Sequence, residues 1–295
     1  MRIIFMGSPN FAIPTLKALI NAQHEIVACF TQPARPKDRG KKLLITPVEA
    51  IAKTYNIPVY TPKSLNNDLN YNLIKKLEAD FIIVVAYGLI LPQNILDLAK
   101  YAALNLHPSA LPQFRGAAPL QRSIMSGATT TNICVIKMLA ALDAGPIYKA
   151  VSLNMAKLNY GELHDESAKL GAKLMVEVIE NFTDLQPVAQ EQHNITYAHK
   201  IAKAEMQINF QQKGQQIINL IRALSPAPGA YFLYKNERYK ILAANFKLCN
   251  HQELTGSLTE NFSLYCQDGL ILPLIIQKSG KKPQKITEFL HGNKI

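Results

Sequence analysis

The feature that most restricts the fold of this chain is an alternation of short β-forming runs with stretches of helical periodicity in its first half. Strand-like runs at 2–6, 25–30, near 59, at 81–86 and at 103–107 are separated by stretches with helical spacing. This alternation is typical of a parallel sheet with helices on both faces. Runs at 133–139 and 147–153 continue the sheet, and a long helix is expected over 161–182. The first half therefore predicts an α/β domain.

One helix start is marked by its capping residues. Thr46-Pro47-Val48-Glu49 combines a capping box with proline at the first helical position, so we expect a helix from there to about Tyr55. Further helices are expected over 14–20, 69–77 and 93–99.

The pattern changes after the long helix. Residues 183–192 are polar and contain Pro187, which is typical of a connection. An amphipathic helix is expected over 214–224, and the alternating runs that follow it predict a small antiparallel barrel. We therefore expect an α/β domain over 1–188, a linker over 189–206 and a β-barrel domain over 207–295. The runs of this barrel are 230–234, 239–244, 262–266 and 270–276.

Composition narrows the class of protein. Of the 295 residues, 48% are apolar, which excludes a mainly disordered chain, and no run approaches the ~20 apolar residues that span a bilayer. The apolar run after Met1-Arg2 is too short for a signal peptide, so we expect a cytoplasmic protein. The cysteines are far apart, with no histidine at ligand spacing, so we expect reduced core residues and no metal site. They are Cys29, Cys134, Cys249 and Cys266.

The net charge of +11 favours a polyanionic partner, with a basic solvated surface as the alternative. Part of the charge lies in the loop 33–43, where five cations stand against Asp38. Such a run is usually a solvated loop, but this one directly follows the second strand and so lies near the end of the sheet where ligands bind. The cations are Arg35, Lys37, Arg39, Lys41 and Lys42.

The familiar phosphate-binding motifs are missing. The turn Gly7-Ser8-Pro9-Asn10-Phe11 lacks the glycine spacing that a dinucleotide needs, and Gly40-Lys41-Lys42-Leu43 does not match a P-loop. Dinucleotide-dependent oxidoreductases and NTPases are therefore poorly supported.

Three polar residues stand where strands end. Asn105 and His107 are two apart on one expected strand, so their side chains point to the same side, just before Pro108. An amide and an imidazole placed together there can stabilise an oxyanion and move a proton. Asp143, which follows a later strand, can orient the imidazole. The alternatives are a pair that satisfies loop backbone groups and an ordinary turn aspartate.

A longer pattern around these residues resembles the 10-formyltetrahydrofolate-dependent formyltransferases. It runs through Asn105-x-His107-Pro108-Ser109-x-Leu111-Pro112, Arg115-Gly116-Ala117-Ala118-Pro119-x-Gln121 and Leu142-Asp143-x-Gly145. Segments at 7–12, 31–43, 85–92 and 221–230 narrow the resemblance to the methionyl-tRNA formyltransferase family, and it covers essentially the whole chain.

The resemblance implies a Rossmann-like formyltransferase domain followed by an antiparallel, OB-like β-barrel domain that helps to hold tRNA. It implies 10-formyltetrahydrofolate as formyl donor, tetrahydrofolate as product and initiator methionyl-tRNA as acceptor, in a monomer without a metal. The implied catalytic residues are Asn105, His107 and Asp143. The implied folate contacts are Tyr87, Gly88, Leu89, Ile90, Ser109, Ala110, Leu111 and Pro112. The implied tRNA contacts are Arg35, Arg39, Lys41, Lys42 and Arg222.

In the implied reaction, the α-amino group of methionyl-tRNA attacks the formyl carbon. Asn105 and protonated His107 would stabilise the oxyanion of the tetrahedral intermediate, and Asp143 would keep His107 oriented and cationic. We expect His107 to protonate the departing nitrogen. The chain departs from the family at Ala110, where leucine is usual and which would leave extra room for folate, and at Pro146, where aspartate is usual.

Two other functions use the same residues. A small-substrate formyltransferase, or a hydrolase of formyl-folate, would need neither the basic loop nor a second basic domain. A tRNA-binding protein with an idle site would have no reason to keep Asn105, His107 and Asp143 together.

Overall fold

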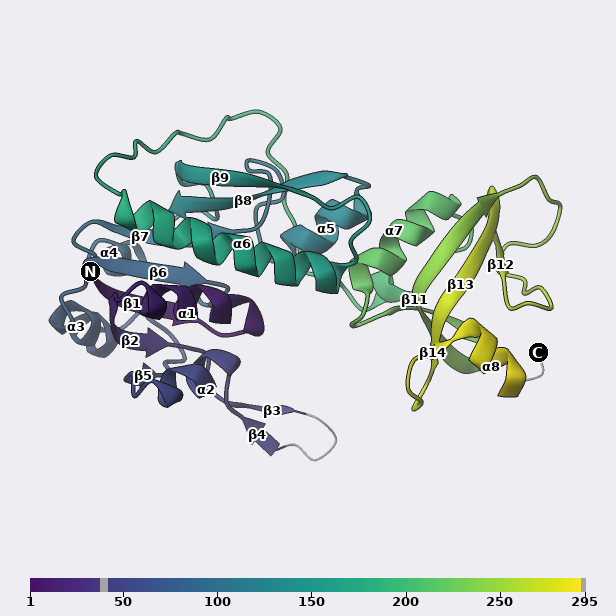
Figure 1. Cartoon of the computed structure of the whole chain (residues 1–295), viewed down its shortest axis with the longest axis horizontal. Coiled ribbons are helices and arrows are strands. Elements are labelled where there is room, and N and C mark those ends of the chain that lie inside the picture. The colour runs from purple at the N-terminus through teal and green to yellow at the C-terminus, as the bar shows by residue number, and fades with distance from the viewer. Residues whose placement is uncertain (38–41, 293–295) are drawn as a thin grey trace. The chain divides into compact units, whose positions relative to one another are not determined.

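A seven-stranded sheet lies at the centre of the first half of the computed structural model, which describes residues 1–37 and 42–292 (Figure 1). Its strands follow the spatial order β5-β2-β1-β6-β7-β8-β9. They are β1 (Arg2–Gly7), β2 (Glu25–Phe30), β5 (Val59–Tyr60), β6 (Phe81–Val85), β7 (Ala102–His107), β8 (Thr130–Lys137) and β9 (Ile147–Asn154). All seven stretches were expected as strands from their β-forming runs.

The pairs from β5 to β7 are parallel, as predicted, but β8 runs antiparallel to β7. A parallel connection needs a crossover, usually a helix that packs on the sheet. The segment between β7 and β8 instead carries the short helix α5 (Pro119–Met125), which belongs to a different compact unit of the chain. The prediction of an α/β domain is confirmed. The prediction that the sheet is parallel is wrong at β8.

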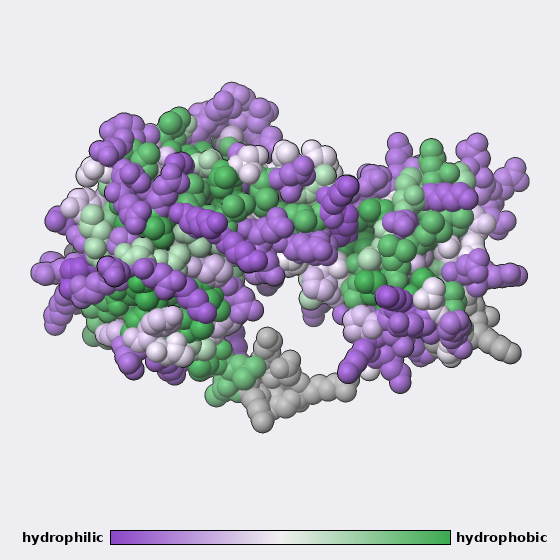
Figure 2. Space-filling model, in the orientation of Figure 1, coloured by the Kyte–Doolittle hydropathy of each residue, from purple (hydrophilic) through white to green (hydrophobic). Residues whose placement is uncertain are grey.

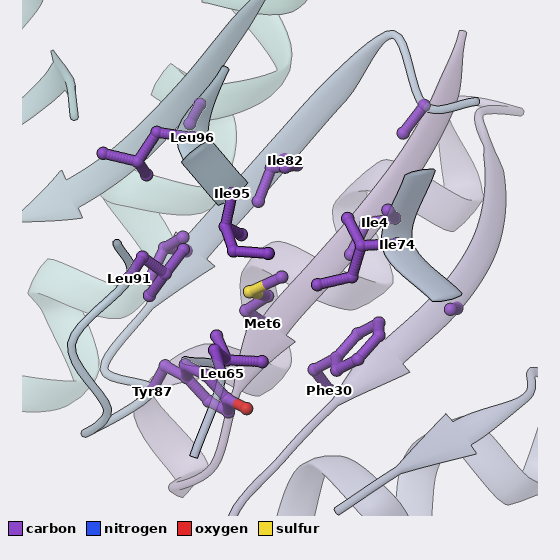
Figure 3. Close-up of a cluster of buried hydrophobic side chains, with 14 residues drawn as sticks. Ile4, Met6, Phe30, Leu65, Ile74, Ile82, Tyr87, Leu91, Ile95 and Leu96 are labelled. Carbon is purple, nitrogen blue, oxygen red and sulfur yellow. The ribbon is translucent and has the colours of Figure 1, made fainter. Parts of the chain in front are cut away.

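Helices cover both faces of the sheet, as the alternation predicted (Figure 1). One face is packed by α3 (Asp68–Lys76) and α4 (Gln93–Leu96), and Figure 3 shows Ile74 from α3 and Ile95 from α4 against Ile4 and Ile82 of the strands. The other face carries α1 (Ile13–Asn21) and α6 (Tyr160–Glu180).

Helix α2 (Pro47–Thr54) begins where the capping residues predicted. The side chain of Thr46 accepts a hydrogen bond from the backbone N–H of Glu49 at 3.1 Å, and Pro47 occupies the first turn. Its start therefore follows from local chemistry alone.

The basic loop begins and ends as a hairpin, which the charge pattern did not indicate. Strand β3 (Arg35–Lys37) pairs with β4 (Lys42–Leu44), and Arg35 lies opposite Leu44. Leu43, Leu44 and Ile45 are exposed, and Figure 2 shows an apolar patch at this hairpin.

The chain forms two compact units. The first comprises Met1–Arg115, Asn132–Leu153 and Asp165–Tyr197. The second comprises Gly116–Thr131, Asn154–His164 and Ala198–Ile295, so it takes up two segments from the middle of the chain. None of the helices in the described ranges is long and apolar enough to cross a membrane.

The second unit is built on an antiparallel sheet with the order β10-β11-β13-β12, and β14 pairs with β13. Register shifts near Ala243 in the long strand β11 let the sheet curl. The sheet encloses an aromatic cluster that includes Phe232, Tyr239, Phe262 and Phe289, so the predicted antiparallel β domain is confirmed. Its elements are the short 3₁₀ turn η2 (Ala204–Met206), α7 (Gly214–Leu224), β10 (Ala230–Tyr234), β11 (Glu237–Leu248), β12 (Leu264–Cys266), β13 (Gly269–Lys278), β14 (Gln284–Lys285) and α8 (Ile286–Gly292).

Candidate active site

The last residues of β7 place an amide and an imidazole on one face of the sheet. Ala103, Asn105 and His107 alternate with Leu104 and Leu106, so they share a face, and Ala103 belongs to the cluster packed by α3 and α4. Asn105 is half-buried, whereas His107 is only 4% exposed. The period of two therefore brings these side chains together, as the sequence predicted.

Asp143 meets both residues from the turn after β8. Its Oδ1 accepts a hydrogen bond from Asn105 Nδ2 at 3.3 Å, and its Oδ2 lies 3.6 Å from His107 Nδ1. The carboxylate thus uses one oxygen toward each partner. Since an amide nitrogen has two N–H groups, Asn105 keeps a second donor for a substrate oxygen.

The other ring nitrogen of His107 faces a backbone group. Its Nε2 lies 3.1 Å from the carbonyl oxygen of Phe114. Both ring nitrogens therefore face acceptors, and only a doubly protonated imidazole donates to both of them. An imidazole that donates at both nitrogens is the form that stabilises a developing negative charge.

The loops proposed for folate leave two neighbouring parallel strands. Residues 86–92 follow β6 and residues 108–112 follow β7, with Val84 paired to Asn105. Ile90 is 89% exposed, while Leu89 and Leu111 are half-buried. Apolar side chains thus stand at the sheet edge that also holds the amide and imidazole.

Tyr87 and Ser109 differ from the other loop residues, because their side chains are internal. The ring of Tyr87 is 2% exposed and packs in the core (Figure 3), and its backbone carbonyl accepts from Ser8 and Gln32. Ser109 is buried and donates from Oγ to the carbonyl of Gln113 at 2.8 Å. Gly88 is exposed, and Ala110 and Pro112 are half-buried.

A pocket of about 300 Å³ lies beside this edge, at the base of the β3–β4 hairpin. Arg35 contributes to its wall and donates from Nη2 to Gln32 Oε1 at 2.9 Å. The remaining lining residues are Gln32, Pro33, Leu44, Thr46 and Gly88. Of the other cations expected to contact tRNA, Arg39 and Lys41 lie outside the described residues, and Lys42 is described as part of β4.

Arg222, in α7, is half-buried within the second unit and bonded to backbone. Its Nε and Nη2 donate to the carbonyl oxygen of Leu158, and Nη2 also donates to that of Met155 at 2.7 Å. Burial lowers the pKa of this guanidinium. The residue therefore holds the segment 155–158 against α7.

A thiol close to the site is kept protonated. Cys134 lies opposite His107 on β8, and burial raises the pKa of its thiol to about 11. Its Sγ donates to the carbonyl of Ser109 at 3.3 Å, so it is unsuited to act as a nucleophile at neutral pH. Across residues 1–37 and 42–292, no three His, Cys, Asp or Glu side chains gather as metal ligands.

Two contacts at the site carry no local sequence signal. Phe114 supplies the carbonyl that faces His107, and Gln190, in the coil after α6, donates to the backbone of the Asp143 turn. The Phe114 contact uses a backbone atom and the Gln190 contact joins residues 47 apart, and periodicity and spacing register neither. A glutamine within an apparent connection offered no reason to single it out.

The sequence matches two family models. The model described as formyl transferase covers residues 1–179, and the model described as formyl transferase, C-terminal domain, covers residues 200–294. A methionyl-tRNA formyltransferase of Rickettsia bellii is 43% identical over 296 residues, covering 100% of this chain and 97% of the relative.

Solved structures share the fold at lower identity. A methionyl-tRNA formyltransferase from Clostridium thermocellum has a TM-score of 0.60 at 19% identity, covering 84% of this chain and 94% of its own. HypX from Aquifex aeolicus, solved in complex with tetrahydrofolic acid, has a TM-score of 0.66 at 17% identity, covering 98% of this chain and 47% of its own.

Proposed function

The chain belongs to the methionyl-tRNA formyltransferase family, and from this premise we propose that it moves the formyl group of 10-formyltetrahydrofolate to the α-amino group of methionyl-tRNA. The products are N-formylmethionyl-tRNA, for translation initiation, and tetrahydrofolate.

The observation that carries this proposal is the Asp143 carboxylate, which faces Asn105 with one oxygen and His107 with the other. A carboxylate in this position orients the imidazole and stabilises its protonated form. Formyl transfer needs a stabilised oxyanion, a proton for the leaving nitrogen and a route for the proton of the attacking amine. The three side chains together cover these needs.

Each residue has a separate part. The second N–H of Asn105 and the cationic ring of His107 stabilise the negative charge that develops on the formyl oxygen, and loss of one such donor typically costs roughly 2.7–4 kcal/mol. His107 supplies the proton that the leaving nitrogen needs. Asp143 balances the positive charge of the His107 ring. It also helps, through a water, to take the proton from the attacking amine.

The loops at the ends of β6 and β7 fit a folate. A pterin presents flat apolar faces and a polar edge, which suits Leu89, Ile90 and Leu111 around exposed backbone groups. Gly88, Ser109, Ala110 and Pro112 complete the proposed contacts, and Tyr87 contributes through its backbone because its ring is internal. A folate held there would bring its formyl carbon toward Asn105 and His107, and it supplies the group to be transferred.

The proposed tRNA contacts are inferred from the charge of the residues and from their position in the fold. Arg35, Arg39, Lys41 and Lys42 belong to the loop that follows β2, at the carboxyl edge of the parallel strands. We also propose that the chain consists of a catalytic domain over 1–188, a linker over 189–206 and a C-terminal domain over 207–295. In this proposal the C-terminal domain also contacts tRNA. There, Arg222 bonds to backbone through Nε and Nη2, which leaves Nη1 as the group for a phosphate.

We also propose that the enzyme is a cytoplasmic monomer and needs no metal. For a reaction without a metal, the support is chemical, since Asn105, His107 and Asp143 supply charge stabilisation and proton transfer from side chains alone. Gel filtration and assays with and without a chelator check these statements.

The experiment that tests the function compares three reactions of the purified protein with 10-formyltetrahydrofolate. We expect transfer to charged initiator tRNA, with slow hydrolysis and slow transfer to free methionine. Equal rates with free methionine would indicate a small-substrate formyltransferase. Binding of tRNA without any turnover would indicate an idle tRNA-binding protein.

A further inference from the structure

The turn that carries Asp143 is held by a buried glutamine from the coil after α6. Gln190 is 6% exposed, and its Nε2 donates to the carbonyl oxygen of Asp143 at 2.8 Å and to that of Gly145 at 2.7 Å. One side chain thus bonds to the backbone on both sides of residue 144. The conformation of this turn is therefore tied to the position of Gln190.

Arg115 fixes which way the amide of Gln190 points. This arginine is 6% exposed, and its Nε and Nη2 donate to Gln190 Oε1 at 3.1 and 2.7 Å. A flipped amide would turn its NH₂ group toward the guanidinium and its oxygen toward two carbonyls. The amide nitrogen is therefore obliged to face the Asp143 turn.

The turn needs this support because its backbone is strained. Asp143 has φ +47°, in the left-handed region that a residue with a side chain seldom adopts. Gly145 lies so close to β8 that an added Cβ would sit 1.7 Å from the carbonyl oxygen of Lys137. Without its bonds to Gln190, the turn would relax and shift the carboxylate of Asp143.

The same coil supports the group on the other side of His107. Thr196 Oγ1 accepts from the backbone N–H of Phe114 at 2.9 Å, and the Thr196 carbonyl accepts from Arg115 N at 3.0 Å. Phe114 supplies the carbonyl that His107 Nε2 faces. Residues 190–196 therefore bond to the Asp143 turn, which faces Nδ1 of His107, and to Phe114, whose carbonyl faces Nε2.

We propose that Gln190, backed by Arg115, is a positioning residue that sets the Asp143 carboxylate against Asn105 and His107, and that Thr196 does the same for the Phe114 carbonyl. Neither residue touches the substrate in this account. The kinetic consequence rests on the proposed function. A purely structural role for this coil would instead lower stability and leave the turnover of each folded molecule unchanged.

The test is the variant Gln190→Glu. Glutamate keeps the volume and the acceptor for Arg115, so the new charge is paired, but it presents an acceptor where the two carbonyls need a donor. We expect kcat for formyl transfer to fall by about 10- to 100-fold, because a shift near 1 Å costs on the order of 10²-fold. We expect KM for both substrates to stay within about twofold. Gln186→Glu, an exposed position on the same coil, is the matched control and should keep its kcat.

A spectroscopic measurement makes the result independent of activity. The ring nitrogens of His107, followed by NMR, should shift in Gln190→Glu and not in Gln186→Glu. Thr196→Val, which removes the acceptor for Phe114 N, should also lower kcat with KM retained. This variant tests the inference if Gln190→Glu does not fold. Wild-type kcat together with unshifted His107 resonances in a folded Gln190→Glu protein overturns the inference. An inactive wild-type protein overturns the proposed function instead, and the resonances still decide the positioning role.

Discussion

At the scale of single residues, the site is organised by one carboxylate. Asp143 reaches Asn105 at 3.3 Å and His107 at 3.6 Å, and the other nitrogen of His107 faces the Phe114 carbonyl at 3.1 Å. The imidazole is thus enclosed by acceptors, while Asn105 retains an N–H that none of these contacts uses. The amide and the ring therefore have different parts in charge stabilisation.

Replacing Asn105 by alanine tests the part of the amide. Asn105→Ala should lower kcat for formyl transfer by ~10²–10³, because it removes one donor to the developing oxyanion. Folate affinity should change little, since Asn105 lies outside the proposed folate loops. Steady-state kinetics and a folate-binding titration check this, and a loss of affinity without a loss of kcat would contradict it.

At the scale of elements, the position of β7 depends on its packing against α6. An added Cβ at Gly171 of α6 would lie 2.5 Å from Cδ2 of Leu106, the buried residue between Asn105 and His107. A Cβ at this position would therefore force Leu106 or the helix to move, and glycine allows the close approach of the helix to the strand that carries the site.

Gly171→Ala should destabilise the protein although alanine favours helices. The gain in helix propensity is about 1 kcal/mol, while overpacking costs about 1–3 kcal/mol, so we expect a net loss of up to about 2 kcal/mol. Urea unfolding measures it, with Lys173→Ala, an exposed change on the same helix, as the control. A more stable Gly171→Ala protein would show that the helix can move away from β7.

A salt bridge in the second unit should make stability depend on pH. Arg122 of α5 donates to Glu205 at 2.5 Å, and this hydrogen bond, with one from Ala202, lowers the pKa of Glu205 below its ordinary value of 4.5. A carboxylate with a depressed folded pKa stabilises the fold above the unfolded pKa, and this contribution disappears as the pH falls through the folded pKa.

Glu205→Gln should therefore have a slightly lower Tm than the wild type at pH 7, and the difference should vanish at a pH below the lowered folded pKa of Glu205. The effect is small, up to about 1 kcal/mol, because the pair is partly exposed. Thermal unfolding at both pH values checks it. A Tm difference that does not change with pH would assign the stabilisation to something other than the charge.

Local signals predicted most of the elements, because period, capping and turn residues act over a few neighbours. The sheet strands, the Thr46 cap and the shared face of Asn105 and His107 all follow from them. The direction of β8, helices α5 and α8, and the β3–β4 hairpin had no such signal.

In the candidate site, too, the sequence indicated residues with a local signal and missed contacts without one. Asp143 could be named from its place after a strand, but Gln190 and the Phe114 carbonyl act through contacts more than 40 residues apart or through backbone atoms. The internal ring of Tyr87 also depends on tertiary packing, which a loop motif does not report.

At the scale of the whole molecule, the net charge of +11 suits a polyanionic substrate. The loop between β2 and α2 carries several of these cations, and its base forms the wall of the pocket beside the strand ends. This location suits a loop that binds phosphates while it presents the acceptor end to the site.

Arg39, Lys41 and Lys42 replaced together by alanine should raise KM for methionyl-tRNA and leave folate binding intact. Each cation–phosphate interaction that the substitutions remove should lower the slope of log affinity against log salt by roughly 0.7–0.9. If the loop also positions the acceptor end, kcat falls as well. Unchanged KM, kcat and salt slope in the triple variant would reject a role of this loop in tRNA binding.

The most direct test of the central claim is the single-turnover rate of formyl transfer to methionyl-tRNA for the wild type, His107→Ala and Asp143→Asn. With folding verified by circular dichroism and both substrates saturating, we predict rates ~10²–10⁴-fold below the wild type for each variant, because each loses the oriented, cationic imidazole. A wild-type rate in either folded variant would contradict the assignment of Asn105, His107 and Asp143 as the catalytic group.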